Sequence, residues 1–343
     1  MHNPLQVLKH YWGYDGFRPG QAEVIDSILS GHDTLALMPT GGGKSITFQV
    51  PALANPGICL VVSPLVALMK DQVKNLQKRG ILSAFISSEM PHWEILQQLD
   101  NCILGDYKFL YISPERISSE LFQEKLKTLS RKVNLLVVDE AHCISQWGND
   151  FRRDYRLIAD IRDVIPHVQV IAVTASATAA VVADICEQLH FRKGYRIFKT
   201  SFERKNLSFV VRKTDNKLKE ICHILSAVPG SAVIYSRTRK GVEEYAGKLR
   251  AAGISAEYFH AGLDPVLKTE RQADWVKGFT RVLVATNAFG MGIDKGDVRV
   301  VIHTEFPDSM EAYYQEAGRA GRDGKRAYAV ALLGPQDITD IKR

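Results

Sequence analysis

The chain has 343 residues, of which 45% are hydrophobic and 24% charged, and a formal net charge of +6. This composition is ordinary for a globular protein, and the length favours two domains over one core. No apolar run approaches the roughly 20 residues of a membrane span, and the first residues lack the pattern of a secretory signal. We therefore expect no membrane association and a cytoplasmic location, nucleoid-associated, or a nuclear one in a eukaryote.

Cysteine spacing and net charge indicate which metal sites, disulfides and charged partners the chain could have. The five cysteines contain no Cys-x-x-Cys pair, so we expect no zinc site and no disulfide framework. They are Cys59, Cys102, Cys143, Cys186 and Cys222. The mild positive excess is compatible with a polyanionic partner and equally with a solvated surface.

Short apolar runs alternate with longer helical patterns along the whole chain. Continuous runs such as Leu135–Val138 are typical of strands buried on both faces of a parallel sheet. The pattern predicts an α/β fold with two series of strands. The first series is 34–38, 58–63, 83–87, 109–113, 133–138, 168–174 and 195–200. The second is 207–213, 231–236, 256–260, 281–286, 298–304 and 326–333. The polar segment 201–206 is the expected hinge, giving domains 1–200 and 201–343.

A glycine-rich loop follows the first predicted strand. Residues 38–45 read Met-Pro-Thr-Gly-Gly-Gly-Lys-Ser between an apolar run and a helical pattern, which is the layout of a nucleotide phosphate cradle. Lys44 would reach the β and γ phosphates, and Ser45 would offer its hydroxyl to Mg²⁺. The backbone of the loop would bind the phosphates; its candidate residues are Thr40, Gly41, Gly42 and Gly43. Met38 stands where the general pattern has its first glycine, so a chance glycine turn is the alternative.

Two carboxylates end a later apolar strand, in the sequence Asp139-Glu140-Ala-His142. At the carboxyl end of a parallel strand they would face the ligand crevice. Asp139 would hold Mg²⁺ through water, and Glu140 would orient and deprotonate the attacking water; a surface turn is the alternative. For His142 we weigh a metal ligand against a hydrogen bond to the strand end at 174–176, and favour the hydrogen bond.

Two further stretches carry aromatic and polar side chains. Gln21, beside Phe17 and Arg18, has the donor and acceptor that can read an adenine edge; a helix N-terminus is the alternative. In residues 143–156, aromatics at 147, 151 and 155 recur among arginines. Such a loop would stack on unpaired bases and hold phosphates. The spacing of four fits a helix with a buried aromatic face equally well.

The second half contains the stretch 315–324, with Arg319 and Arg322 three residues apart. Guanidinium groups match phosphate oxygens, and arginines of this kind act as fingers on a transferring phosphoryl group. A basic helix end is the alternative. Polar residues also end several later strands. Arg237, Thr238 and Thr286 are candidate phosphate contacts, and Asp294 is a candidate ribose contact; capped strand ends are the alternative.

Together these residues resemble a superfamily 2 helicase core, and specifically a RecQ-type DNA helicase. The match covers nearly the whole chain in order. It runs through residues 17–21, 38–45, 62–65, 70–72, 111–115, 139–142, 146–152, 201–206, 258–262, 286–294 and 314–324. The stretch at 146–152 is the most specific to RecQ proteins.

The resemblance implies two RecA-like domains with ATP and Mg²⁺ in a cleft between them. It implies ATP-driven 3′ to 5′ translocation on single-stranded DNA with strand separation, on single-stranded and partly duplex DNA. Arg322 becomes the expected finger, with Arg319 beside it, and Gln21 the adenine reader. The DNA contacts implied are Pro64, Lys70, Gln146, Trp147, Phe151, Arg152, Arg237, Thr238 and Thr286. We expect a monomer.

The sequence departs from the family in two places. Residues 174–178 read Thr-Ala-Ser-Ala-Thr, which is closer to the Ser-Ala-Thr of RNA helicases. The zinc subdomain and winged helix that commonly follow a RecQ core are not found within these residues. The alternatives are therefore an RNA helicase, and a DNA-stimulated translocase with weak unwinding. A small-molecule P-loop kinase would have no use for residues 314–324.

Overall fold

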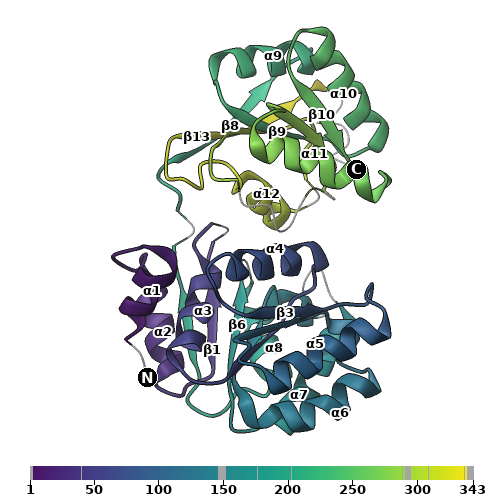
Figure 1. The fold of residues 1–343 in the computed structure, drawn as a ribbon. Coiled ribbons are helices and arrows are strands. Elements are labelled where there is room, and N and C mark those ends of the chain that lie inside the picture. The colour runs from purple at the N-terminus through teal and green to yellow at the C-terminus, as the bar shows by residue number, and fades with distance from the viewer. Residues whose placement is uncertain are drawn as a thin grey trace. The chain divides into compact units, whose positions relative to one another are not determined.

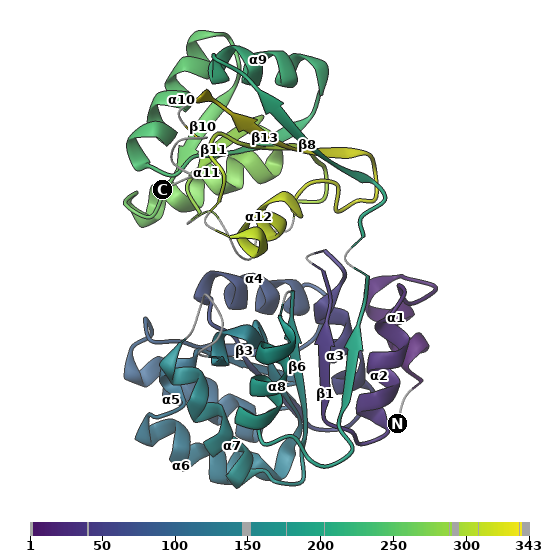
Figure 2. The same ribbon diagram turned by 180° about the vertical axis from the view of Figure 1, so that it is seen from behind.

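The computed structural model describes residues 3–39, 41–145, 152–175, 177–201, 203–287, 289, 295–307, 309–335 and 337. The chain divides into two compact units, Met1–Phe202 and Glu203–Arg343, and the division falls within the predicted hinge segment. Each unit contains one parallel sheet with helices on its faces (Figures 1 and 2).

The first unit is built on a seven-stranded sheet of order β3-β4-β2-β5-β6-β1-β7, in which every recorded pairing is parallel. Its strands are β1 (Thr34–Leu37), β2 (Ile58–Val62), β3 (Ser83–Ile86), β4 (Phe109–Ile112), β5 (Val133–Val138), β6 (Gln169–Thr174) and β7 (Arg196–Lys199). Each strand of the first predicted series is present.

The strands of this sheet alternate between two cores, as the two-residue period of a strand requires. Leu60 and Val62 of β2 enter one core, whereas Cys59 and Val61 enter the other. The first core is covered by α5 (His92–Leu104), α6 (Glu120–Leu129), α7 (Ile158–Val164) and α8 (Ala179–Gln188). The second is covered by α1 (Pro4–Trp12), α2 (Gln21–Leu29), α3 (Lys44–Ala54) and α4 (Val66–Gln77).

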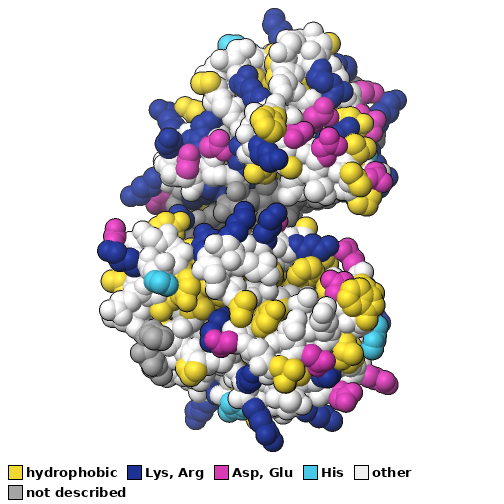
Figure 3. Space-filling model, viewed as in Figure 1, with side chains coloured by type: hydrophobic (Ala, Val, Ile, Leu, Met, Phe, Trp, Pro, Cys, Tyr) yellow, Lys and Arg dark blue, Asp and Glu magenta, His cyan; other side chains and the backbone are white. Residues whose placement is uncertain are grey.

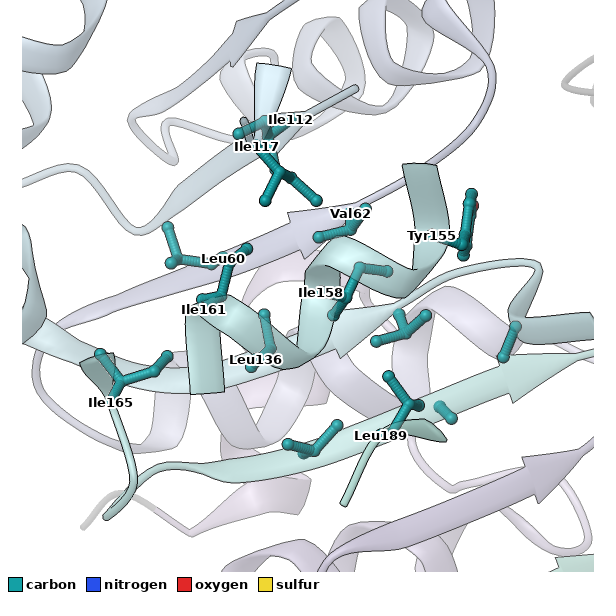
Figure 4. Packing of buried hydrophobic residues seen from close by; sticks show 14 of the residues in the cluster. Leu60, Val62, Ile112, Ile117, Leu136, Tyr155, Ile158, Ile161, Ile165 and Leu189 are labelled. Carbon is teal, nitrogen blue, oxygen red and sulfur yellow. The ribbon is translucent and has the colours of Figure 1, made fainter. Parts of the chain in front are cut away.

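Short 3₁₀ turns link the regular elements of this unit. They are η1 (Pro114–Arg116), η2 (Ser130–Lys132), η3 (Ala141–Ile144) and η4 (Arg153–Leu157). Figure 4 shows how η4 and α7 are fixed: Ile158 and Ile161 lie beside Leu60 and Leu136 of the sheet, and Tyr155 belongs to the same hydrophobic cluster. These side chains are fully buried. The segment that follows residues 146–151 is therefore anchored in the hydrophobic core.

The second unit is built on a six-stranded parallel sheet of order β10-β11-β9-β12-β13-β8. Its strands are β8 (Leu207–Lys213), β9 (Ser231–Tyr235), β10 (Ala256–Phe259), β11 (Val282–Ala285), β12 (Val298–His303) and β13 (Ala327–Leu333). Helices α9 (Lys217–Ala227) and α10 (Arg239–Ala251) cover one core, and α11 (Pro265–Lys277) covers the other together with the end of α12 (Met310–Ala317).

The predicted α/β fold with two parallel sheets is confirmed. Within the described ranges, none of the helices combines the length and apolar character that a membrane crossing needs.

Candidate active site

The predicted catalytic groups of the first unit meet at one edge of its sheet. The glycine loop follows β1, Ser63 follows β2, Asp139 follows β5, and Thr174 ends β6. In an open parallel sheet the carboxyl ends of the strands form the ligand-binding edge. Sheet pairing thus brings together residues that are far apart in the chain, such as Leu37 of β1 and Thr174 of β6, which are 137 positions apart.

The glycine loop leads directly into α3, whose first residue is Lys44. Gly41 and Gly43 have φ angles of 80° and 78°, which residues with a Cβ rarely adopt. A Cβ on Gly42 would also lie 2.9 Å from the Pro39 carbonyl oxygen. The loop therefore needs glycine at these positions, and the N-terminus of α3 offers backbone N–H groups to an anion. Thr40 lies outside the described residues.

Gln21 is buried and holds the glycine loop instead of pointing into open space. Its Oε1 accepts from the Arg18 backbone N–H at 2.8 Å, and its Nε2 donates to the carbonyls of Gly42 and Gly43 at 3.3 and 3.1 Å. Arg18 donates to the Gly41 carbonyl at 2.8 Å. In this state both ends of the Gln21 amide are engaged by backbone, so an adenine edge would have to replace these bonds.

A chain of polar side chains runs from the loop across the sheet edge. Lys44 Nζ lies 3.4 Å from Glu140 Oε1, and Glu140 Oε2 lies 3.4 Å from His142 Nδ1. His142 Nδ1 also hydrogen-bonds Thr174 Oγ1 at 2.8 Å, so the predicted bond from His142 to this strand end is confirmed. The described part of the chain holds no cluster of His, Cys, Asp and Glu able to bind a metal ion on its own.

The two neighbouring carboxylates have opposite electrostatic environments. Burial and the adjacent Glu140 carboxylate raise the pKa of Asp139 to about 6, although Lys44 opposes the shift. Burial also disfavours the charge of Glu140, but Lys44 and His142 outweigh it and lower the pKa of that carboxyl. Asp139 accepts from the Glu140 N–H at 3.0 Å and from Ser63 Oγ at 3.4 Å. Lys44 therefore faces both carboxylates, and among the described residues its ion pair is with Glu140.

These residues fit a nucleotide with a divalent cation. Oxygen ligands and a hydroxyl are what Mg²⁺ prefers, and an added positive charge would relieve the unfavourable ionisation of Asp139. The glycine backbone, the helix N-terminus and Lys44 provide complementary positive potential for phosphates. The arrangement suits charge neutralisation and water activation, which are the main demands of phosphoryl transfer.

The stretch predicted to contact DNA divides into two parts. Arg152 Nη1 donates to the Pro64 carbonyl at 3.1 Å, so two of the predicted DNA contacts lie side by side. Tyr155 is fully buried, and its hydroxyl donates to the Asp139 carbonyl at 2.9 Å. For Tyr155 the core interpretation of the aromatic spacing is the correct one. Gln146, Trp147 and Phe151 lie outside the described residues.

Positive side chains gather over α4 in Figure 3. Lys70 and Lys74 of this helix are exposed. Lys70 pairs with Glu89 at 3.2 Å, but both side chains are more than half exposed, so the pair is weak and exchangeable for a phosphate.

In the second unit the two arginines differ in exposure. Arg319 is 6% exposed, and its guanidinium lies 5.9 Å from the centre of the Phe289 ring. Arg322 is less buried. Burial raises the pKa of Tyr235 to about 12, and the charges of both arginines oppose this shift. The helix before them is tied to the sheet by a 2.7 Å contact between Glu316 and the buried His303.

The other predicted contacts of this unit lie at strand ends. Thr238 is the N-cap of α10 and accepts from the Gly241 N–H at 3.0 Å, as the capping alternative stated. Arg237 is exposed and donates to the Phe306 carbonyl at 2.7 Å. Thr286 is buried, and Asp294 lies outside the described residues.

Sequence reasoning missed the role of two residues in the predicted hinge. Arg204 and Asn206 belong to the second unit and donate to backbone carbonyls of the arginine stretch. The resemblance over 201–206 was the available signal, but it did not indicate what these side chains contact.

Comparisons with known proteins identify the family. The pattern of the DEAD/DEAH box helicase family matches residues 18–185, and that of the helicase conserved C-terminal domain matches residues 216–324. The chain is 43% identical over 341 residues to the ATP-dependent DNA helicase RecQ of Bacillus subtilis, covering 98% of this chain and 57% of that protein. It is 40% identical over 338 residues to the probable ATP-dependent DNA helicase RecS of the same organism, covering 97% and 67%.

The chain belongs to the RecQ family of ATP-dependent DNA helicases. It spans little more than half the length of the B. subtilis RecQ protein. The fold is similar to that of the DUF1998 helicase MrfA bound to DNA, with a TM-score of 0.80 at 17% identity, over 100% of this chain and 50% of that one. The predicted RecQ resemblance and the two RecA-like domains are thereby confirmed.

Proposed function

We propose that this chain is the motor core of an ATP-dependent DNA helicase, which couples ATP hydrolysis to 3′ to 5′ translocation on single-stranded DNA and to strand separation. The observation that carries the proposal is the contact between Lys44 and Glu140 at the head of α3, beside Asp139. This geometry joins a phosphate-binding loop to the carboxylates needed for hydrolysis, within a chain of the RecQ family.

The residues of the first unit have distinct proposed roles. Lys44 and the backbone of the glycine loop bind the phosphates, and Ser45 and Asp139 would hold Mg²⁺, partly through water. The cation would supply charge neutralisation on the phosphates. Glu140 orients the attacking water and accepts its proton. Its lowered pKa keeps the carboxylate ionised, and the carboxylate becomes available to water once Lys44 turns from it to the phosphate.

The second unit supplies the arginine finger. We propose that Arg322 binds the terminal phosphate during turnover, because it is the less buried of the pair, while Arg319 stays packed against Phe289. ATP bound by groups from both units would draw the units together, and hydrolysis would release them. If the two units bind the DNA strand alternately during this cycle, the protein would move along the strand. Asp294 is the proposed ribose contact.

DNA is the proposed polymer, in single-stranded and partly duplex form. Pro64, Lys70, Arg152 and the aromatic residues 147 and 151 would contact the strand. Because Arg152 donates to the Pro64 carbonyl, a strand bound to one segment would affect the other. The sequence of residues 174–178 resembles that of RNA helicases, but the RecQ relatives favour DNA over RNA, and we expect weak unwinding by a monomer.

The decisive experiment measures ATP turnover with no nucleic acid, single-stranded DNA, duplex DNA and RNA. Strong stimulation by single-stranded DNA is the expected result; stronger stimulation by RNA would refute the choice of polymer. Lys44→Ala should abolish hydrolysis. Arg322→Ala should leave ATP binding intact and lower turnover roughly a thousandfold, as arginine fingers generally contribute. Near-normal turnover in Arg322→Ala would remove this residue from the mechanism.

A further inference from the structure

The guanidinium group of Arg204 donates hydrogen bonds to several backbone carbonyls in the stretch that contains Arg319 and Arg322. Arg204 donates to the carbonyl oxygens of Gly318, Ala320 and Gly321 at 3.4, 3.0 and 2.7 Å. All of these atoms belong to the second unit, so the arrangement does not depend on the first. The donor comes from 114 to 117 positions earlier in the chain.

Asn206 completes the contact from the same side. Its Nδ2 donates to the carbonyls of Gly321 and Lys325, each at 2.8 Å. Gly321 has a φ of 63°, and a Cβ there would lie 2.6 Å from Asn206 Nδ2. The close approach of this amide therefore requires glycine immediately before Arg322.

Helix chemistry explains why a guanidinium is suited to this place. Helix α12 ends at Ala317, and the last carbonyls of a helix lack partners within it. Arg204 satisfies carbonyls just beyond that end, and its fixed fork of N–H groups bonds several of them at once, which a lysine ammonium does less rigidly. The backbone carbonyls of Gly318, Ala320 and Gly321 are thus bonded by side chains from outside the turn.

These hydrogen bonds constrain where the Arg322 side chain can point. Arg322 directly follows Gly321, whose carbonyl accepts from Arg204, so the position of its guanidinium depends only on the torsion angles of Arg322 itself. A group acting on a transferring phosphoryl must be placed within about 0.5 Å. We propose that Arg204, supported by Asn206, is a positioning residue for ATP hydrolysis that holds the arginine stretch so that Arg322 reaches the phosphate. This inference rests on the proposed function of Arg322 as the finger.

The second unit contains a matched control for a purely structural role. Arg281 donates in the same manner to the Gly230 and Val228 carbonyls, both at 3.1 Å, and to the Leu225 carbonyl. These lie at the end of α9, away from the arginine stretch in the chain. Arg281→Ala removes a comparable set of hydrogen bonds without touching residues 318–322.

The test compares Arg204→Ala, Arg204→Lys, Arg281→Ala, Arg322→Ala and the double variant Arg204→Ala/Arg322→Ala. Each is assayed for DNA-stimulated kcat, for KM of ATP and for thermal stability. We expect Arg204→Ala to lower kcat between about tenfold and a hundredfold, as a misplacement near 1 Å does, with KM for ATP little changed. Arg204→Lys should retain an intermediate kcat, and it carries the test if the alanine variant fails to fold.

The double variant separates positioning from general damage. If Arg204 acts through Arg322, the double variant turns over no more slowly than Arg322→Ala alone, because residues acting as one unit are not additive. Arg281→Ala should lose stability and keep its kcat. Equal kcat losses in Arg204→Ala and Arg281→Ala, or full additivity in the double variant, would overturn the inference. Near-normal kcat in Arg322→Ala would instead refute the proposed finger.

Discussion

The neighbouring carboxylates Asp139 and Glu140 should have opposite effects on stability when each is replaced by its amide. Burial and the adjacent Glu140 carboxylate raise the pKa of Asp139 from its usual 3.8 to about 6. Since one unit corresponds to about 1.4 kcal/mol, the ionised carboxylate costs at most about 3 kcal/mol at neutral pH. Solvent at the partly buried site reduces this ceiling. We expect Asp139→Asn to stabilise the protein without nucleotide by about 1–2 kcal/mol.

The pH dependence gives the sign of each effect. The folded protein binds the Asp139 proton more tightly than the unfolded chain, so this carboxylate destabilises increasingly as the pH rises from its usual pKa of 3.8 through about 6. The advantage of Asp139→Asn should therefore vanish below that usual value. Glu140 has a lowered pKa, so its charge stabilises the fold above its usual 4.5, and that contribution is lost as the pH falls through the lowered value.

Glu140→Gln should consequently destabilise at neutral pH, because Lys44 loses its partner at 3.4 Å. The assay is thermal unfolding followed by circular dichroism with a chelator and no nucleotide, at neutral and acidic pH. A gain of about 2–8 °C in the unfolding midpoint is expected for Asp139→Asn, since 1 kcal/mol is worth about 2–4 °C in a domain of this size. Both variants should be inactive in hydrolysis. Shifts of the same sign in the two variants would refute the reasoning.

Two further predictions concern the stretch from 146 to 156. If Trp147 stacks on bases, Trp147→Ala should lower DNA-stimulated hydrolysis far more than basal hydrolysis, since stacking contributes about 1–3 kcal/mol per base; equal losses in both assays would favour a core aromatic. Tyr155→Phe should keep the packing but lose the bond to the Asp139 carbonyl, lowering the free energy of unfolding by about 1 kcal/mol. Unchanged stability in a denaturant titration would show that this bond is dispensable.

Much of the fold could be predicted because its causes are local. A strand covered on both faces must be apolar throughout, so a run such as Leu135–Val138 predicts a central parallel strand. The glycine loop could be found for the same kind of reason. Positive φ angles at Gly41 and Gly43 and a helix beginning at Lys44 are dictated by adjacent residues.

Sequence spacing was less informative where one pattern serves two structures. Tyr155 shares its four-residue spacing with positions 147 and 151, yet it lies in the hydrophobic core and donates to the Asp139 carbonyl. Gln21 carries the groups that could read adenine, but in this state it holds the carbonyls of Gly42 and Gly43. A side chain's type limits which bonds it makes, whereas the packing around it selects among them.

The sequence by itself predicted the strands of two parallel sheets, the phosphate loop and the family, because each is recognised from runs or motifs of adjacent residues. Only the tertiary structure decided which distant groups meet. It places Lys44 beside Glu140. It also shows that Arg204, which lies in the predicted hinge segment, donates to the Gly321 carbonyl just before Arg322. The physical reason is that a hydrogen bond depends on distance and direction in space, and sheet pairing fixes these between residues that no local pattern relates.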